Sequence, residues 1–316
     1  MKRLSAIALV VFLSTPAIAQ VVGLGTTQIG ATNQLSIGIA KVVSDKSGVQ
    51  MRTQPMAGAA QYAPLVNSGD IDFGISNITE LHYLINGKVM IEGRKNPELR
   101  LVARLVPFYT GFVVKGDSPY RSMKDMKGQP VPYGFAGNPL GRVLIDGFLA
   151  NAGLSAADIR QVPVPSFPRM FDAFKQQQTA GSIVTVGTSQ LKEWEVALGS
   201  VRYLSFDDSP GAVAALNKFV PYSYVVTYQP GPGTTGIAVP TNLMVFDYTL
   251  WTNAKVKDDV VAKVTEALFS NPQLLKDTSP LWKEFEPALM SKDLGVAYHP
   301  GAIRFYRSKG MWPGKK

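Results

Sequence analysis

The chain has 316 residues, of which 46% are hydrophobic and 17% charged, so it can bury a substantial core and lacks the composition of a disordered protein. It has no cysteine, which excludes thiol catalysis, cysteine-ligated zinc and iron–sulfur clusters. The formal net charge is +9, but the basic residues are scattered among acidic ones, so a nucleic-acid-binding face is not expected.

The first residues predict an export signal. Lys2 and Arg3 form a basic start, residues 4–13 are almost purely apolar, and the small residues before and at Ala19 suit a signal peptidase. The apolar run is shorter than the roughly 20 residues that a membrane span needs. We therefore expect a signal peptide over residues 1–19, cleaved near Ala19, and a mature protein in the periplasm; a buried N-terminal helix is the alternative.

Short apolar, β-rich runs alternate with helical patterns through most of the chain. In its first part, strands are expected over 21–25, 49–53 and 71–76, and helices over 35–46 and 59–66. The same order restarts after Pro107, with strands expected over 112–114, 131–135, 182–186, 237–239 and 243–246, and helices over 143–150, 167–178, 256–269 and 302–307. Such alternation is typical of an α/β fold built from parallel βαβ units.

Enzyme signatures are nearly absent from the sequence. The two histidines, His82 and His299, have no metal-binding spacing, and the Pro-Gly after His299 favours a turn at a helix start. Residues 189–192 fit S-x-x-K without its partner motifs, and residues 231–236 fit G-x-G-x-x-G but precede a predicted strand instead of a helix. We therefore expect no enzyme activity, no metal and no cofactor.

Loops rich in glycine and short polar residues follow five of the predicted strands. They are residues 25–33, 56–60, 76–77, 136–141 and 185–188. Backbone N–H groups and the helix dipole at such loops can bind an anion, although short polar residues also cap helices for purely structural reasons. Ligands of open α/β sheets bind at the carboxyl ends of the strands, so the five loops together predict a ligand site.

Several segments carry a resemblance to a known family. They are the Gly-rich loop at 25–33, the turn at 58–60, Asn67–Ile75, Leu99–Ala103, Ser122–Gly128, the helix end Asn151–Leu154 and the segment Tyr298–Tyr306. In these the chain resembles the TAXI-type extracytoplasmic solute-binding proteins, the binding subunits of one class of tripartite ATP-independent (TRAP) transporters. The loops near residues 30, 58 and 138 depart from the usual family pattern, so the ligands of relatives are not transferred to this chain.

The resemblance implies a two-lobed periplasmic binding protein of type II-like α/β fold, each lobe a mostly parallel sheet flanked by helices, with the ligand cleft between lobes. We expect one lobe to comprise residues 20–112 and 238–316 and the other residues 113–237, joined by hinges at 107–113 and 237–239. The implied role is a monomer that captures a small organic anion and delivers it to TRAP membrane subunits. The alternatives are a sensor read by a membrane receptor and an enzyme on the same fold.

The candidate ligand-binding residues lie in these loops or close behind them. They are Gly25, Thr26, Thr27, Gly58, Ala59, Ser76, Asn77, Gly137, Asn138, Arg142, Arg169, Thr185, Gly187 and Thr188. Arg142 and Arg169 are the possible cationic partners of a ligand carboxylate, because the planar guanidinium donates two parallel hydrogen bonds; either could instead pair with a surface acid. Ile29, Pro139 and Leu140 suggest that the ligand has an apolar body.

Overall fold

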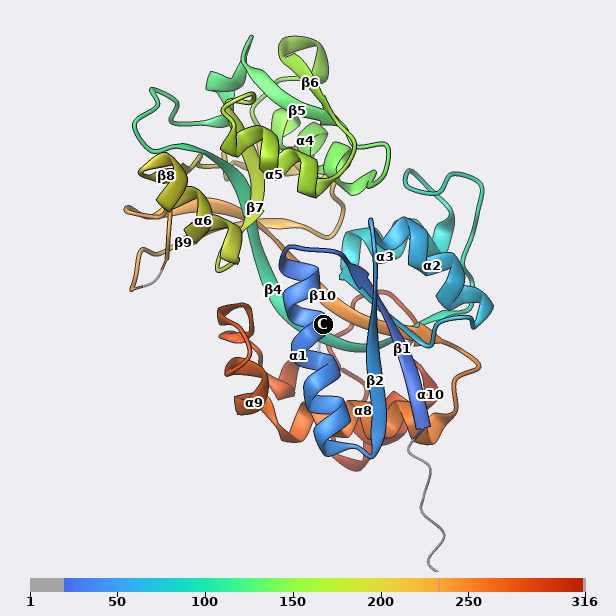
Figure 1. Ribbon diagram of the computed structural model, residues 1–316. Coiled ribbons are helices and arrows are strands. Elements are labelled where there is room, and N and C mark those ends of the chain that lie inside the picture. Colours follow the sequence, from blue (N-terminus) through green and yellow to red (C-terminus); the bar gives the residue numbers. More distant parts are fainter. Residues whose placement is uncertain (1–19, 233, 315–316) are drawn as a thin grey trace, which may run out of the picture.

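A computed structural model describes residues 20–232 and 234–314, and the predicted signal segment 1–19 lies outside them. Figure 1 shows two lobes, one above the other, with the long strands β4 (Leu99–Lys115) and β10 (Thr241–Asn253) running between them. Of the helices in the described part of the chain, none is long and apolar enough to cross a membrane.

The first lobe is built on the strand order β2-β1-β3, in which β1 pairs in parallel with both neighbours. These strands are β1 (Gln20–Thr27), β2 (Val49–Met56) and β3 (Phe73–Asn77). The helices of this lobe are α1 (Ala31–Lys46), α2 (Ala59–Ser68), α3 (Ile78–Asn86), α8 (Asp258–Ser270), α9 (Pro272–Lys276) and α10 (Pro300–Ser308). The parallel pairing brings the carboxyl ends of all three strands to one edge, which faces the second lobe (Figure 1).

Close packing fixes the end of β3 against β10. A Cβ on Gly74 would lie 2.2 Å from the ring of Trp251, so only glycine fits there. The indole N–H of Trp251 donates to the hydroxyl of Ser76 over 3.0 Å, and both side chains are fully buried. The end of β3, which leads into the predicted loop at 76–77, is therefore held rigidly by the core.

The second lobe contains the parallel pair β5 (Pro130–Gly134) and β6 (Arg160–Val164), together with β7 (Gly181–Thr185), β8 (Val201–Tyr203) and β9 (Tyr224–Tyr228). Its helices are α4 (Leu140–Asn151), α5 (Phe167–Lys175), α6 (Ser189–Leu198) and α7 (Pro210–Asn217). Strands β7 and β8 pair antiparallel with β4, and β9 pairs antiparallel with β10, so this part of the sheet is antiparallel where the sequence predicted mostly parallel pairing.

The two lobes share β4 and β10, which pair with each other along most of their length. Strand β10 pairs with β9 over residues 241–245 and with β3 over residues 248–252, so it passes from the second lobe to the first at residues 246–247. The strand expected at 237–239 is wrong, because these residues form no strand. Gly236 has a φ of +83° and Pro240 lacks an N–H, and both features oppose a ladder there.

His299 stands at the start of α10, as the sequence predicts. Its ring Nδ1 accepts a hydrogen bond from the backbone N–H of Gly301 over 3.1 Å, and its side chain is fully buried. The other histidine, His82, contacts the carbonyl oxygen of Leu294 through Nε2 at 3.0 Å and stacks on Tyr222. Both histidine side chains therefore make contacts within the fold: one caps a helix, and the other stacks on an aromatic ring.

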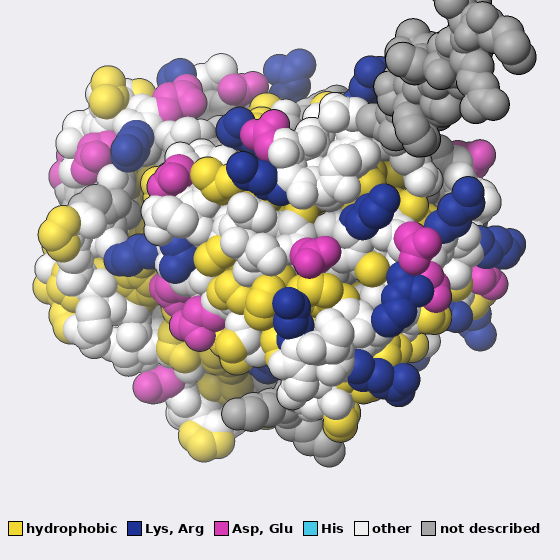
Figure 2. All heavy atoms as spheres, turned by 90° about the horizontal axis from the view of Figure 1, so that it is seen from below, with side chains coloured by type: hydrophobic (Ala, Val, Ile, Leu, Met, Phe, Trp, Pro, Cys, Tyr) yellow, Lys and Arg dark blue, Asp and Glu magenta, His cyan; other side chains and the backbone are white. Residues whose placement is uncertain are grey.

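The charged side chains of the surface are mixed in sign. Figure 2 shows lysine and arginine residues interspersed with acidic residues over the face that it presents. This distribution agrees with the scattered basic residues of the sequence, and on this face it offers no continuous basic patch of the kind that binds nucleic acid.

Candidate functional site

A cavity of about 90 Å³ lies between the two lobes. Its lining comes from both: Thr27, Gln28, Ile29, Gly30, Ala31, Thr32, Ala57, Asn77 and Glu80 from the first lobe, Phe108, Thr110, Phe246 and Tyr248 from the crossing strands, and Asn138, Leu140, Leu144, Phe167, Pro168, Phe171, Ile183, Val184, Thr185 and Thr188 from the second. By comparison, an engineered cavity of about 150 Å³ binds benzene, so this cavity suits a small solute.

All five loops that the sequence singled out contribute to this lining. Thr27, Ala57 and Asn77 come from the first three loops, Asn138 from the fourth and Thr185 with Thr188 from the fifth. The N-termini of α1, α3, α4 and α6 lie at the same cavity, because each helix begins directly after one of these loops. The βα topology thus collects segments that are far apart in sequence at one site.

Some candidates from these loops lie outside the lining. The buried hydroxyl of Thr26 donates to the hydroxyl of Ser36 over 2.8 Å. The hydroxyl of Ser76 accepts a hydrogen bond from the indole N–H of Trp251. Gly25, Gly58, Ala59 and Gly137 are likewise outside the lining, whereas Gly187 lines a neighbouring hollow beside Tyr109 and Glu284. These residues are close to the site in sequence, but they do not border the cavity.

The two arginines do not reach the cavity. Arg142 is exposed on α4, and the side chain of Arg169 is 71% exposed and lies 3.7 Å from the carboxylate of Asp172. Each residue follows a lining loop directly, yet one turn of helix is enough to direct the side chain away from the cleft. Neither arginine is therefore placed to serve as the cationic partner of a ligand carboxylate in this structure.

Hydrogen bonds join the lobes around the cavity. The side-chain amide of Asn138 donates to the carbonyl oxygen of Ala57 over 3.0 Å. Gln34 on α1 donates to the hydroxyl of Ser189 at the start of α6 over 2.9 Å. The hydroxyl of Tyr83 donates to the carbonyl oxygen of Phe219 over 2.8 Å, so the cavity is bordered by contacts from several elements. Gly58 also packs here, since a Cβ on it would lie 2.7 Å from the amide of Asn138.

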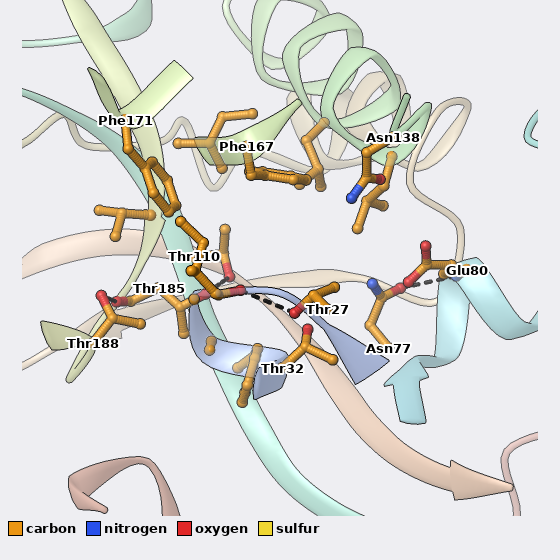
Figure 3. A pocket seen from close by; sticks show the side chains of 18 of the residues that line it. Thr27, Thr32, Asn77, Glu80, Thr110, Asn138, Phe167, Phe171, Thr185 and Thr188 are labelled. Carbon is orange, nitrogen blue, oxygen red and sulfur yellow. Dashed lines mark hydrogen bonds between the residues drawn. The ribbon is translucent and has the colours of Figure 1, made fainter. Parts of the chain in front are cut away.

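One end of the cavity is formed by Asn77 and Glu80 at the start of α3 (Figure 3). Asn77 caps this helix, and its Oδ1 accepts from the backbone N–H of Glu80 over 2.8 Å. The side chain of Asn77 is 1% exposed, and its Nδ2 has no hydrogen-bond partner among the described residues. Figure 3 shows this amide nitrogen directed toward Thr27 and the cavity, where a solute oxygen could accept from it.

Glu80 supplies a carboxyl group to the same end of the cavity. The residue is 4% exposed, and burial raises the pKa of its carboxyl from 4.5 to about 8. Within the described lining of the cavity it is the one side chain that can carry a full charge, because lysine, arginine, histidine and aspartate are absent there. Glu80 is not among the residues predicted from sequence, since an Asn followed three residues later by Glu is the common pattern of a helix cap.

Hydroxyl groups line the opposite end. The side chains of Thr110 and Thr185 are hydrogen-bonded to each other over 3.0 Å, and Thr188 donates to the carbonyl oxygen of Thr185. Closer to Glu80, Thr32 and Tyr248 share a further hydroxyl contact. Between the two polar ends, Phe167 and Phe171 form the wall on the side of the second lobe (Figure 3). The cavity thus suits a small solute with polar groups and an apolar body.

Residues 25–310 match the model of the NMT1-like family, so the chain belongs to this family. A solved structure described as a periplasmic transporter is 13% identical, with a TM-score of 0.59 over 94% of this chain and 95% of that chain. PhnD1 from Prochlorococcus marinus, in complex with methylphosphonate, is 12% identical, with a TM-score of 0.55 over 92% of this chain and 99% of that chain.

A binding-protein component of an ABC phosphonate transporter from Pseudomonas aeruginosa is also similar. It is 12% identical to this chain, with a TM-score of 0.55 over 85% of this chain and 81% of that chain. These likenesses, together with the sheet flanked by helices in each lobe, show that the fold is the two-lobed α/β fold of periplasmic binding proteins, as the sequence predicts.

Proposed function

We propose that the protein is a periplasmic solute-binding protein, which captures a small molecule in the cavity between its lobes and delivers it to a membrane transporter. The observation that carries this proposal is the cavity itself, lined by both lobes and bordered by hydrogen bonds from one lobe to the other. A solute can favour the closed arrangement only through contacts that the open arrangement lacks, and a lining drawn from two lobes supplies such contacts.

The partner that we propose is a TRAP-type set of membrane subunits, for which the resemblance to TAXI proteins is the support. The solved structures of similar fold include a component of an ABC transporter, so the test must separate the two classes. In cells that carry the chain and its membrane partners, TRAP-type uptake should stop when the ion gradient is collapsed and should not need ATP directly. Uptake that follows ATP and ignores the ion gradient would favour an ABC partner, and signalling without uptake would favour a sensor.

The sequence predicts a negatively charged solute. The helix N-termini at the cavity still support an anion, but the two arginines do not face it. A thermal-shift screen of small anions, cations and neutral solutes tests the binding function whatever the charge. At a solute concentration 100-fold above Kd the folded state gains about 2.7 kcal/mol, which is easily seen as a raised Tm. If no solute raised the Tm, the proposed binding function would be wrong.

A further inference from the structure

Glu80 has no role within its own lobe that explains its burial. Its backbone N–H donates to the capping side chain of Asn77 at the start of α3. The residue is 4% exposed, and it lines the cavity. A carboxylate that is out of water and unpaired is unfavourable, so such groups are usually paired with a cation or held in the neutral form. Within the part of the chain that the structure describes, the lining contains no lysine, arginine or histidine that could be the partner.

The rest of the lining also favours a positive charge. Phe108, Phe167, Phe171, Phe246 and Tyr248 all contribute to it, and aromatic rings attract cations through their faces. The helix N-termini oppose this preference, but the effect of each is confined to its first turn, whereas the charge of Glu80 lies on the cavity wall itself. The ionised carboxylate of Glu80 carries a full negative charge inside the cavity.

We propose that the cavity binds a small organic amine in its protonated form, with the ammonium group held by the carboxylate of Glu80. The amide nitrogen of Asn77, which lacks a partner among the described residues, offers a further donor to any oxygen that such a solute carries. The aromatic walls enclose the carbon body of the solute. This inference rests on the proposed function, because it takes the cavity as the site of solute capture.

The pH dependence of binding separates this inference from its main competitor. In the ligand-free protein the pKa of Glu80 is about 8, so a protonated amine must displace a proton from the carboxyl near neutral pH. Its affinity should rise by up to about tenfold per pH unit between pH 6 and 8 and then level off. A neutral Glu80 that donates to a solute carboxylate would give an affinity that is nearly constant below pH 8 and falls above it.

The other ionisable groups near Glu80 leave this trend intact. Tyr62 on α2 and Tyr248 on β10 interact with the charge of Glu80, and burial raises the pKa of both above its ordinary value. On α3 itself, burial lowers the pKa of His82 from 6.5 and raises that of Tyr83, and Asp247 on β10 is paired with Arg104 and Lys292. Strand β3, which also packs against α3, carries no ionisable side chain. These tyrosines are therefore neutral over the whole range in which Glu80 titrates.

The experiment uses matched solutes on the full mature chain. Benzylamine, benzoate and benzyl alcohol share one carbon skeleton, as do isoamylamine, isovalerate and isoamyl alcohol. Calorimetry in buffers of different ionisation enthalpy measures the affinity and the proton release of each solute between pH 6 and 8. We expect the amines to bind more tightly than their partners, with release of up to one proton. Tighter binding of the carboxylates, or no binding of either amine, would overturn the inference.

Two isosteric variants complete the test. Glu80→Gln should weaken amine binding at least about tenfold, because it removes the charge that pairs with the ammonium. Glu92→Gln removes the same charge from an exposed position outside the lining and should leave the affinity unchanged. Equal amine affinity in the wild type and Glu80→Gln would also overturn the inference, and the wild-type pH profile decides if the variant fails to fold. If carboxylates or alcohols bind where amines do not, the binding function stands and only the inference fails.

Discussion

The side-chain amide of Asn138 donates a hydrogen bond to the carbonyl oxygen of Ala57 over 3.0 Å, and the two residues belong to opposite lobes. Asn138 is 3% exposed and lines the cavity beside this bond. One side chain thus contacts both the opposite lobe and the space for the solute. Such a residue contributes to solute binding chiefly through the closed arrangement of the lobes.

Asn138→Ala should weaken solute binding by about 0.5–1.5 kcal/mol, the usual contribution of one hydrogen bond. The melting temperature of the ligand-free protein should change little, because the bond joins the lobes and does not build either core. Titration calorimetry measures the first quantity and circular dichroism the second. Asn86→Ala is the matched control, since its amide bonds to the carbonyl oxygen of His82 within α3. Equal losses of affinity in both variants would argue against a role in closure.

Gly58→Ala tests the closed arrangement by a different route. The new methyl group would lie 2.7 Å from the amide of Asn138, which must move and give up its bond to Ala57. The open form has no such contact, so affinity should fall severalfold while each lobe stays folded. Gly211→Ala is the control, because nothing lies within 4 Å of the added atom. An unchanged affinity for Gly58→Ala would mean that the lobes do not meet here when the solute is bound.

The burial of Glu80 predicts how stability depends on pH. Its carboxyl keeps a proton in the folded protein up to a pKa of about 8, whereas the unfolded chain releases it near the ordinary value of 4.5. Between these values the folded state binds more protons, so stability falls as the pH rises, by up to about 1.4 kcal/mol per unit. Urea unfolding of the ligand-free wild type and of Glu80→Gln measures the difference. Parallel profiles for the two proteins would show that Glu80 titrates normally.

His299 should contribute to stability and not to binding. His299→Ala removes the acceptor for the N–H of Gly301 at the start of α10, which should cost about 0.5–2 kcal/mol in the free energy of unfolding. His299→Asn offers an oxygen at a similar position and should restore part of that loss. Solute affinity should be the same in all three proteins. A change in affinity without a change in stability would give His299 a role that its position does not suggest.

The sequence predicted the architecture and the loops of the cavity because both depend on local patterns. Gly25–Asn33 and Ala136–Gly141 are rich in glycine and short polar residues, which mark strand-to-helix loops wherever they fold. The helices α3 and α6 were missed although Ile78, Leu81 and Leu84 have helical spacing and are buried in α3. The apolar stripes of these two helices are short, so their helical spacing is hard to recognise among the surrounding polar residues.

The chemistry of the cavity was harder to predict. Arg169 is close to a lining loop in sequence, but its direction depends on the turn of α5 on which it lies. Glu80 fits a helix cap by its spacing from Asn77, and only the packing of α3 against β10 shows that the carboxyl is buried. The passage of β10 from lobe to lobe is also a long-range feature, because it depends on pairing with β9 and β3.

A solute that binds between the lobes should hold them together. The chain has no cysteine, so Ile37→Cys on α1 and Val196→Cys on α6 allow two spin labels to be attached at defined sites. Both positions are more than half exposed, at 53% and 87%, and they lie on the helices that Gln34 and Ser189 join. Double electron–electron resonance should show a shorter and narrower distance distribution with any solute that raises the melting temperature. An unchanged distribution at saturating solute would show that the solute does not bring the two lobes together.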